Sequence, residues 1–184
     1  DSQDFPWIVT FSGGKDSTLV AHLVFDVLLS IPKSLRKRQV YFVSNDTLVE
    51  SPLVVEHMRK TLRAILSSAK SFGLPIDGEI TTPKLQETFW TLLIGKGYPS
   101  PNRSMRWCTD RLKIQPTSQY ILSKVDANGS AIILLGVRKD ESATRRASIE
   151  NHKNKANSNL TAHSSLKNAL VYRPIMNVTT EDVW

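Results

Sequence analysis

Two spacings of apolar residues recur along the chain. Short runs rich in Val, Ile, Leu and Phe predict buried strands, and longer segments with apolar residues three and four positions apart predict amphipathic helices. The predicted strands cover residues 7–11, 39–44, 79–82, 131–137 and 170–175, of which 79–82 is the weakest. The predicted helices cover residues 17–29, 52–72, 85–94, 140–149 and, interrupted at Pro116, 109–126. Residues 150–168 are rich in Ser, Asn and Lys without a clear period, and they predict a long basic loop.

The alternation of strands with helices predicts an α/β fold, with a mostly parallel sheet and helices on both of its faces. We expect one domain over residues 1–184. Ligands of such sheets bind beyond the carboxyl ends of the strands. Four stretches are expected at that edge, namely 12–18, 45–46, 136–138 and the loop that leads to Cys108.

Composition narrows the class of protein. Of the 184 residues, 40% are hydrophobic and 22% are charged, which is typical of a soluble domain with a packed core. The net charge of +7 favours polyanionic partners. The single cysteine excludes a disulfide within the chain and favours a reducing, cytoplasmic location. The most apolar segment, 19–31, carries His22 and Asp26 and is too short to span a bilayer, so we expect no membrane association.

The chain has no initiator Met and stops within the sequence TTEDVW. A hydroxyl followed by acids and then by apolar residues is how a helix begins. We therefore expect the sequence to be a piece of a longer protein.

The stretch SGGKDST, residues 12–18, lies between the first predicted strand and the first predicted helix. Backbone N–H groups at a helix N-terminus bind anions, and adjacent glycines let the backbone approach a phosphate closely. The lysine adds a positive charge, and the aspartate is compatible with phosphate when a divalent cation accompanies it. The alternative is an ordinary glycine turn before a helix. The predicted phosphate-binding residues are Ser12, Gly13, Gly14, Lys15, Asp16, Ser17 and Thr18.

This stretch resembles the loop S-G-G-x-D-[ST] of the N-type ATP pyrophosphatases, the PP-loop superfamily. The resemblance implies an adenine nucleotide α-hydrolase-like, Rossmann-like fold that binds ATP with Mg²⁺. It implies that ATP is cut between its α and β phosphates, that the loop holds the departing pyrophosphate, and that an acceptor becomes adenylated. On this basis Lys15 and Asp16 are candidate catalytic residues, and Asp16 is a candidate Mg²⁺ ligand.

Downstream blocks carry a narrower resemblance. The blocks RWCTDRLKIQP at 106–116 and GVRKDES at 136–142 resemble phosphoadenylylsulfate (PAPS) reductase-like proteins. Together with NDTLVESP at 45–52 and FWTLLIGKGYPSPN at 89–102, they are most similar to DNA phosphorothioation sulfurtransferases of the DndC type. That family implies sulfur incorporation into the DNA backbone, with DNA, a cysteine desulfurase as sulfur donor and other phosphorothioation proteins as partners.

The same family implies a 4Fe–4S cluster held by cysteines. A cubane cluster needs four thiolates, and this chain has only Cys108. We therefore expect the remaining ligands in a cysteine-bearing region after Trp184, and no stable cluster on this fragment.

Three further residues have two interpretations each. Cys108 lies among basic residues that favour a thiolate, as a cluster ligand or sulfur relay, but a lone cysteine is also a common packing residue. Asp46 ends the second strand, where it contacts a ribose or a metal or else forms a turn. Arg138 follows Gly136 at the end of the strand 131–137, and this arrangement predicts a phosphate contact by the guanidinium and the adjacent backbone. The alternative for Arg138 is the charged start of a helix.

Basic residues concentrate in the second half of the chain. The residues predicted to form a DNA-facing surface are Arg138, Lys139, Arg145, Arg146, Lys153, Lys155, Lys167 and Arg173. The alternative is a solvated loop. The basic connector 33–38 is expected at the opposite edge of the sheet, where it serves solubility.

Two other functions stay open at this level. One is a reductase of adenylyl sulfate or phosphoadenylyl sulfate, which the same resemblance allows but which does not cut ATP. The other is a non-catalytic subunit that binds nucleotide or DNA within a larger assembly.

Overall fold

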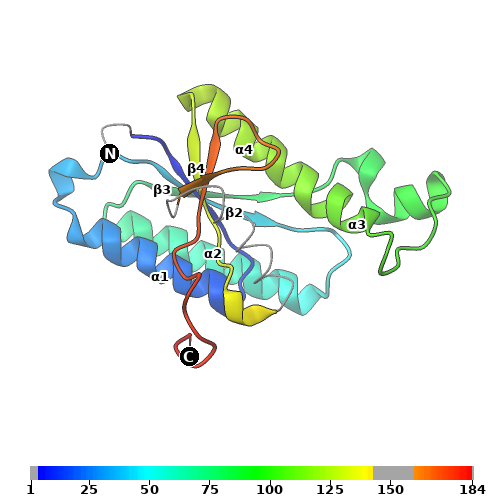
Figure 1. Ribbon diagram of the computed structural model, residues 1–184, viewed down its shortest axis with the longest axis horizontal. Coiled ribbons are helices and arrows are strands. Elements are labelled where there is room, and N and C mark those ends of the chain that lie inside the picture. The colour runs from blue at the N-terminus through cyan, green and yellow to red at the C-terminus, as the bar shows by residue number, and fades with distance from the viewer. Residues whose placement is uncertain (1–3, 143–159, 184) are drawn as a thin grey trace.

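The computed structural model describes residues 4–142 and 160–183. Its centre is a six-stranded sheet of order β3-β2-β1-β4-β6-β5 (Figure 1). The strands β1 to β4 and β6 are parallel, and β5 pairs with β6 in the antiparallel direction. The strand bounds are β1 Trp7–Thr10, β2 Val40–Asn45, β3 Ile76–Thr81, β4 Ala131–Leu134, β5 Leu160–Ala162 and β6 Ala169–Tyr172. The predicted α/β fold is confirmed.

Strand β1 occupies the centre of the sheet, between β2 and β4. The chain builds outward through β2 and β3, then crosses back to β4 on the other side of β1. This reversal creates a topological switch point between β1 and β4. In parallel sheets the crevice at such a point, beyond the carboxyl ends of the strands, is the usual ligand site.

Helices cover both faces of the sheet (Figure 1). Helices α1 (Lys15–Ser30) and α2 (Pro52–Ser71) pack on one face, where their apolar residues join Val9, Phe42 and Leu134 in one core cluster. Helix α4 (Gln115–Asn128) packs on the other face with Ile8 and Ile133. Adjacent strand residues therefore contribute to opposite cores, as the alternation of side chains along a strand requires.

The chain between β3 and α4 is irregular. It contains the 3₁₀ turn η2 (Leu85–Glu87), the π-helical turn η3 (Thr91–Gly95), the short turn α3 (Trp107–Thr109) and the π-helical turn η4 (Asp110–Ile114). The prediction of one helix over 85–94 is wrong, because extended backbone at Thr88 separates two turns. The predicted interruption at Pro116 is also wrong. Pro116 has no backbone N–H to donate, and it follows the wide π-helical turn η4, where the α-helical hydrogen-bond pattern is already altered. The helical path therefore continues from Trp107 to Asn128.

Other boundaries differ in smaller ways. Strand β3 begins at Ile76, before the apolar residues that predicted it, because backbone pairing with β2 extends it. Strand β5 lies inside the interval 150–168, where a loop was predicted, and is stabilised by its pairing with β6. The predicted helix 140–149 and the part 150–159 of the basic loop fall mostly outside the described residues, although the turn η5 (Lys139–Glu141) begins the former. Among the described residues, no helix is long and apolar enough to cross a membrane.

Candidate active site

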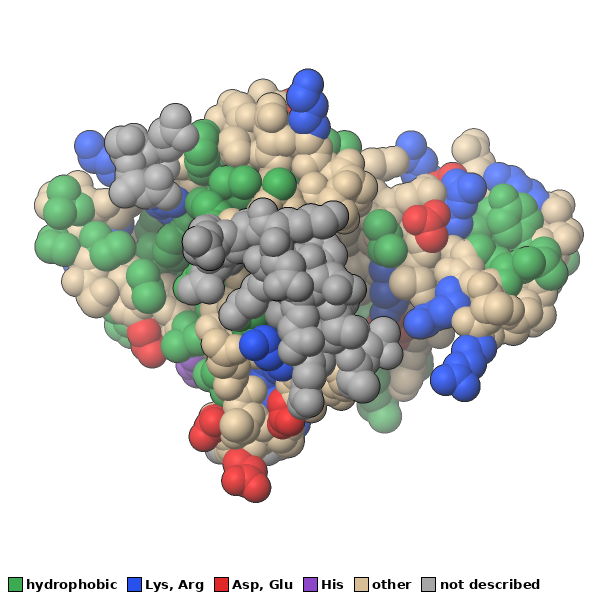
Figure 2. All heavy atoms as spheres, in the orientation of Figure 1, with side chains coloured by type: hydrophobic (Ala, Val, Ile, Leu, Met, Phe, Trp, Pro, Cys, Tyr) green, Lys and Arg blue, Asp and Glu red, His purple; other side chains and the backbone are tan. Residues whose placement is uncertain are grey.

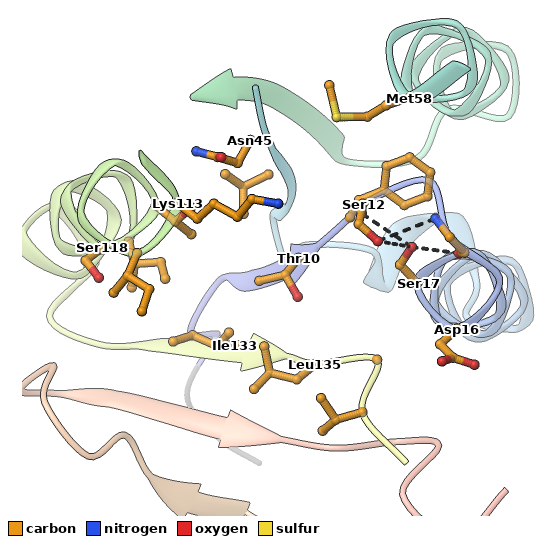
Figure 3. Close-up of a pocket in the computed structure, with 18 of the residues that line it drawn as sticks. Thr10, Ser12, Asp16, Ser17, Asn45, Met58, Lys113, Ser118, Ile133 and Leu135 are labelled. Carbon is orange, nitrogen blue, oxygen red and sulfur yellow. Dashed lines mark hydrogen bonds between the residues drawn. The ribbon is translucent and has the colours of Figure 1, made fainter. Parts of the chain in front are cut away.

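A cavity of about 600 Å³ opens at the carboxyl edge of the sheet, beside the switch point. Its walls come from the ends of β1, β2 and β4, from the start of α1, and from the η4–α4 segment (Figure 3). Of the predicted phosphate-loop residues, five line it, namely Ser12, Gly14, Lys15, Asp16 and Ser17. Asn45 and Gly136, at the ends of β2 and β4, line it as well. Of the four stretches expected at the ligand edge, 12–18, 45–46 and 136–138 contribute residues to the cavity wall, whereas the loop that leads to Cys108 contributes none among the described residues.

The loop after β1 leaves the start of α1 open to a ligand. Gly14 is the N-cap of α1, and no side chain caps this helix. The first N–H groups of any α-helix lack partners within the helix, so they are available to an anion. The hydroxyls of Ser17 and Thr18 turn inward instead, donating to the Gly14 carbonyl at 2.8 and 3.0 Å. These two hydroxyls shape the loop, and their contact with a phosphate stays a prediction.

Neighbouring elements hold the loop from two sides. Gly13 has a φ of +76°, which favours glycine, and its carbonyl lies 3.3 Å from Nε2 of His57 on α2. On the other side, a Cβ at Gly136 would lie only 3.1 Å from the Asp16 backbone. The end of β4 therefore reaches the start of α1 because residue 136 has no side chain.

Arg138 is placed differently from the prediction. Its side chain is only 2% exposed, and its Nε donates to Oδ1 of Asp16 at 2.8 Å. Its Nη1 contacts Oγ1 of Thr180 at 3.2 Å and the Val178 carbonyl at 3.4 Å. The prediction that Arg138 faces DNA at the surface is wrong, because the guanidinium is buried in this network. Arg138 is not among the described residues that line the cavity. Its contact with a nucleotide phosphate stays a prediction.

The same ion pair bears on the predicted Mg²⁺ ligand. One carboxylate oxygen of Asp16 accepts a hydrogen bond from Arg138, and the Asp16 side chain lies in the first turn of α1 (Figure 3). The described residues contain no group of three or more His, Cys, Asp or Glu side chains arranged to hold a metal ion. The role of Asp16 as a Mg²⁺ ligand stays a prediction.

Asp46 is also engaged within the protein. Its side chain is buried, Oδ1 accepts from the backbone N–H of Leu48 at 2.9 Å, and Oδ2 pairs with Arg59 at 2.9 Å. This geometry is the turn interpretation of the sequence, and the contact with a ribose or a metal stays a prediction. Next to it, Asn45 lines the cavity with a carboxamide whose oxygen is buried without a hydrogen-bond partner in the described structure.

The segment after Cys108, and not Cys108 itself, reaches the cavity. Cys108 lies half-buried in α3, whereas Lys113 extends from η4 into the cavity (Figure 3). Nζ of Lys113 lies 2.6 Å from Oε1 of Glu50, on the connection between β2 and α2. One cysteine cannot supply four thiolates, so the residues present do not fit a 4Fe–4S cluster.

Sequence analysis missed several residues of this site. Besides Lys113 and Glu50, these are Met58, Thr117, Ser118 and His163. Lys113 and Thr117 are one helical turn apart in a helix that was expected near the ligand edge. This spacing is the sequence signal for the α4 side of the cavity. His163 carried no signal, because its position depends on strand β5. Its Nδ1 accepts from the N–H groups of Ser165 and Leu166, and burial, with the nearby Arg173, lowers the pKa of this imidazole.

Comparison with known proteins agrees with this architecture. The chain matches the model of the phosphoadenosine phosphosulfate reductase domain over residues 6–184. The uncharacterized protein MJ0066 of Methanocaldococcus jannaschii is 26% identical over 180 residues, which are 97% of this chain and 30% of that protein's length. The crystal structure of PAPS reductase from Candida auris, a phosphate complex, has the same fold, with a TM-score of 0.57, 16% identity, and coverage of 97% of this chain and 70% of the other. By the extent of the family match, this chain belongs to the phosphoadenosine phosphosulfate reductase domain family.

Proposed function

We propose that this chain cleaves ATP between its α and β phosphates and transfers AMP to an acceptor. The observation that carries the proposal is the uncapped start of α1, which opens into the cavity beside Lys15. Backbone N–H groups and a lysine at this point provide the positive charge that a leaving pyrophosphate needs. Membership in the reductase domain family supports an enzyme that uses a nucleotide.

The cavity suits an adenine nucleotide in one orientation. Its volume lies in the range of small-molecule sites. We place the phosphates at the loop and the adenosine between the edge of β4 and helix α4, where the lining is apolar. The apolar lining residues on that side are Ile114, Ile121, Ile133, Leu135 and Val137. The carboxamide of Asn45 lies in the wall as a polar contact for the nucleoside.

In the proposed reaction, an oxygen of the acceptor forms a bond to the α-phosphorus. The bond from that phosphorus to the bridging oxygen breaks, and the electron pair leaves with pyrophosphate. Lys15 and the N-terminus of α1 bind the leaving group. Lys113, in the opposite wall, exchanges its partner Glu50 for a phosphate oxygen. Bound Mg²⁺ supplies further charge neutralisation on the phosphates.

The proposed acceptor chemistry is sulfur incorporation into the DNA backbone. What supports it is the resemblance of the blocks at 45–52, 89–102 and 106–116 to the phosphorothioation sulfurtransferases. A cysteine desulfurase and other phosphorothioation proteins are the proposed partners. The chain spans 30% of the length of its relative from M. jannaschii, so an iron–sulfur cluster is proposed only for a protein that supplies the other cysteines.

The test is release of pyrophosphate from ATP labelled at the γ position, together with ATP affinity. Replacing Lys15 with Ala is expected to weaken ATP binding about 10- to 100-fold, which corresponds to the loss of one charge-assisted hydrogen bond. The matched control is Lys33→Ala, which removes the same charge from the turn η1 (Lys33–Leu35), between α1 and β2. Equal ATP affinity of Lys15→Ala and the control would exclude the loop as the phosphate site.

A second candidate, a reductase of a sulfated adenine nucleotide, is favoured by the family match and by the fold shared with PAPS reductase. Such a reaction reduces the sulfuryl group to sulfite with two electrons from a dithiol, and ATP is not consumed. Incubation with adenylyl sulfate or phosphoadenylyl sulfate and a dithiol tests it. Sulfite release without pyrophosphate release from ATP would replace the lead proposal with this one.

A further inference from the structure

Residues 84–109 form a lobe beyond the carboxyl edge of the sheet, here named the aromatic lobe. It lies at the right-hand end of Figure 1. Three of its rings pack together: Phe89 stacks on Trp107 with centroids 5.4 Å apart, and Tyr98 meets Trp107 edge-on at 5.4 Å. A fourth ring, Trp90, packs edge-on against Phe89 at 5.1 Å and is 60% exposed. The inner rings thus hold Trp90 in a fixed place with its surface open to solvent.

The aromatic lobe is also strongly basic. It has four exposed cations, Lys84, Lys96, Arg103 and Arg106, against one acid, Glu87. Glu87 pairs with Arg111 on the adjoining turn η4, at 3.3 Å. Within the described part of the chain, none of the four cations forms an ion pair. Figure 2 shows the result at this end of the molecule, where apolar side chains lie among blue, cationic ones.

We infer that the aromatic lobe binds single-stranded DNA. An exposed ring among these four cations matches a polynucleotide with accessible base faces, because bases stack on the ring while phosphates contact the cations. A duplex keeps its base faces covered, so it gains only the phosphate contacts. The choice of DNA over RNA rests on the proposed function, since both polymers offer the same faces and charges.

The position of the lobe connects it to the candidate active site. Trp107 and Lys113 lie on one continuous helical path, so they are separated by about 9 Å along it. Lys113 is already in the cavity wall. A strand on the aromatic lobe therefore passes the mouth of the cavity, where an adenylated or sulfur-accepting phosphate has to be.

The test uses fluorescence anisotropy of a labelled oligo(dT) over a range of salt concentrations, without ATP. Trp90→Ala is expected to weaken binding roughly 10-fold or more, with the salt dependence unchanged, because a base loses its stacking partner. Arg103→Gln combined with Arg106→Gln is expected to reduce the slope of log K against log salt by about 1.4, or about 0.7 per phosphate contact. Trp90→Phe should restore most of the affinity.

The matched control is Lys33→Gln with Lys37→Gln, which removes the same charge from the exposed connector between α1 and β2. It should leave both affinity and slope unchanged. An equal loss in this control, or no loss in Trp90→Ala, overturns the inference. So does binding of duplex DNA as tight as that of oligo(dT). Thermal unfolding of each variant checks that the lobe variants stay folded. If Trp90→Ala does not fold, Trp90→Phe and the double variant Arg103→Gln with Arg106→Gln still test the inference.

The two proposals fail separately. Oligonucleotide binding is measured without nucleotide, and ATP binding is measured without DNA. Loss of the first with the second intact removes the aromatic lobe as a DNA surface. Loss of the second with the first intact removes the ATP reaction only.

Discussion

Two segments follow parallel strands at the same edge of the sheet, yet they are built in opposite ways. The phosphate loop after β1 passes from strand to helix within a few residues, and it lies so close to the end of β4 that a Cβ at Gly136 would be 3.1 Å from the Asp16 backbone. The aromatic lobe after β3 contains 3₁₀ and π-helical turns and is held by ring contacts between its own side chains. Contacts with the core of the domain fix the loop after β1, whereas contacts among its own side chains mainly fix the aromatic lobe.

This difference predicts how each segment responds to change. Substitutions in the phosphate loop should alter the stability of the whole domain, because the loop shares its contacts with β4, α2 and the segment after β6. Substitutions in the aromatic lobe should alter local opening of the lobe and leave the sheet intact. The following variants test that division, in order of decreasing effect.

The largest effect is expected from Asp16→Ala. This change removes the nearer carboxylate from the buried guanidinium of Arg138 and leaves only Asp140, at 3.8 Å. Breaking a buried ion pair by removing one partner costs about 3–5 kcal/mol. The free energy of unfolding, measured by urea denaturation, should fall by that amount. The double variant Asp16→Ala with Arg138→Met should recover part of the loss, because no buried charge is left unpaired. Equal stability of the single and double variants would show that the ion pair does not hold the loop.

A smaller effect, of about 1–3 kcal/mol, is expected from Gly136→Ala, since overpacking forces the end of β4 away from α1. ATP affinity should fall with stability, because the same shift moves the start of α1. Gly95→Ala is the matched control, as its new methyl group would lie 3.8 Å from Thr91, an ordinary contact. If both variants unfold at the same urea concentration, the close approach between residue 136 and the Asp16 backbone does not limit the stability of the domain.

The contrast also explains which features the sequence could reveal. The strand ends and the strand–loop–helix geometry of residues 12–18 were predictable because their signals are local: apolar runs and paired glycines. The phosphate-binding role of this loop stays a prediction. The meeting of residues 12–18 with 45 and 136 then follows from the parallel topology. Where side chains point is not local, so Arg138 was expected on a DNA-facing surface but lies buried beside Asp16.

The aromatic lobe was poorly predicted for a physical reason. Its π-helical turn η3 has no distinct apolar period, and its shape depends on rings far apart in sequence, such as Phe89 and Trp107. Strand β5 was missed for a similar reason, because only its pairing with β6 makes the three-residue segment Leu160–Ala162 a strand. Lys113 and Glu50 could be brought together only by the fold.

Within the aromatic lobe, Phe89→Leu should remove the ring contacts with Trp90 and Trp107 while keeping an apolar side chain of similar size. Aromatic pairs contribute about 0.5–1.5 kcal/mol beyond their burial, so local opening of the lobe should become easier by about that amount. Amide hydrogen exchange over residues 89–107 should speed up about 2- to 10-fold. Unchanged exchange in α1 serves as the internal control, and a uniform rise across the domain would contradict the local character of the lobe.

Acidification is a mild probe that acts outside both segments, on His163. Burial lowers the pKa of His163, so the unfolded chain binds this proton more readily than the folded one. Stability should therefore be complete above the ordinary histidine pKa of about 6.5 and decrease as the pH falls below it. His163→Asn retains an acceptor for the N–H groups of Ser165 and Leu166 and should flatten this part of the pH profile. An unchanged slope in His163→Asn would assign the acid sensitivity to another group.

The smallest effect on stability is expected at the ion pair between Glu50 and Lys113, which joins the β2–α2 connection to η4 in the cavity wall. Both side chains are partly exposed, and such pairs contribute about 0–1 kcal/mol. Glu50→Gln should therefore leave urea denaturation nearly unchanged, whereas it frees Lys113 from a competing carboxylate and should strengthen ATP binding a few-fold at low salt. Lys113→Met in the same background should abolish that gain. If Glu50→Gln weakens ATP binding instead, the carboxylate positions Lys113 rather than competing for it, and the ion pair is part of the binding site.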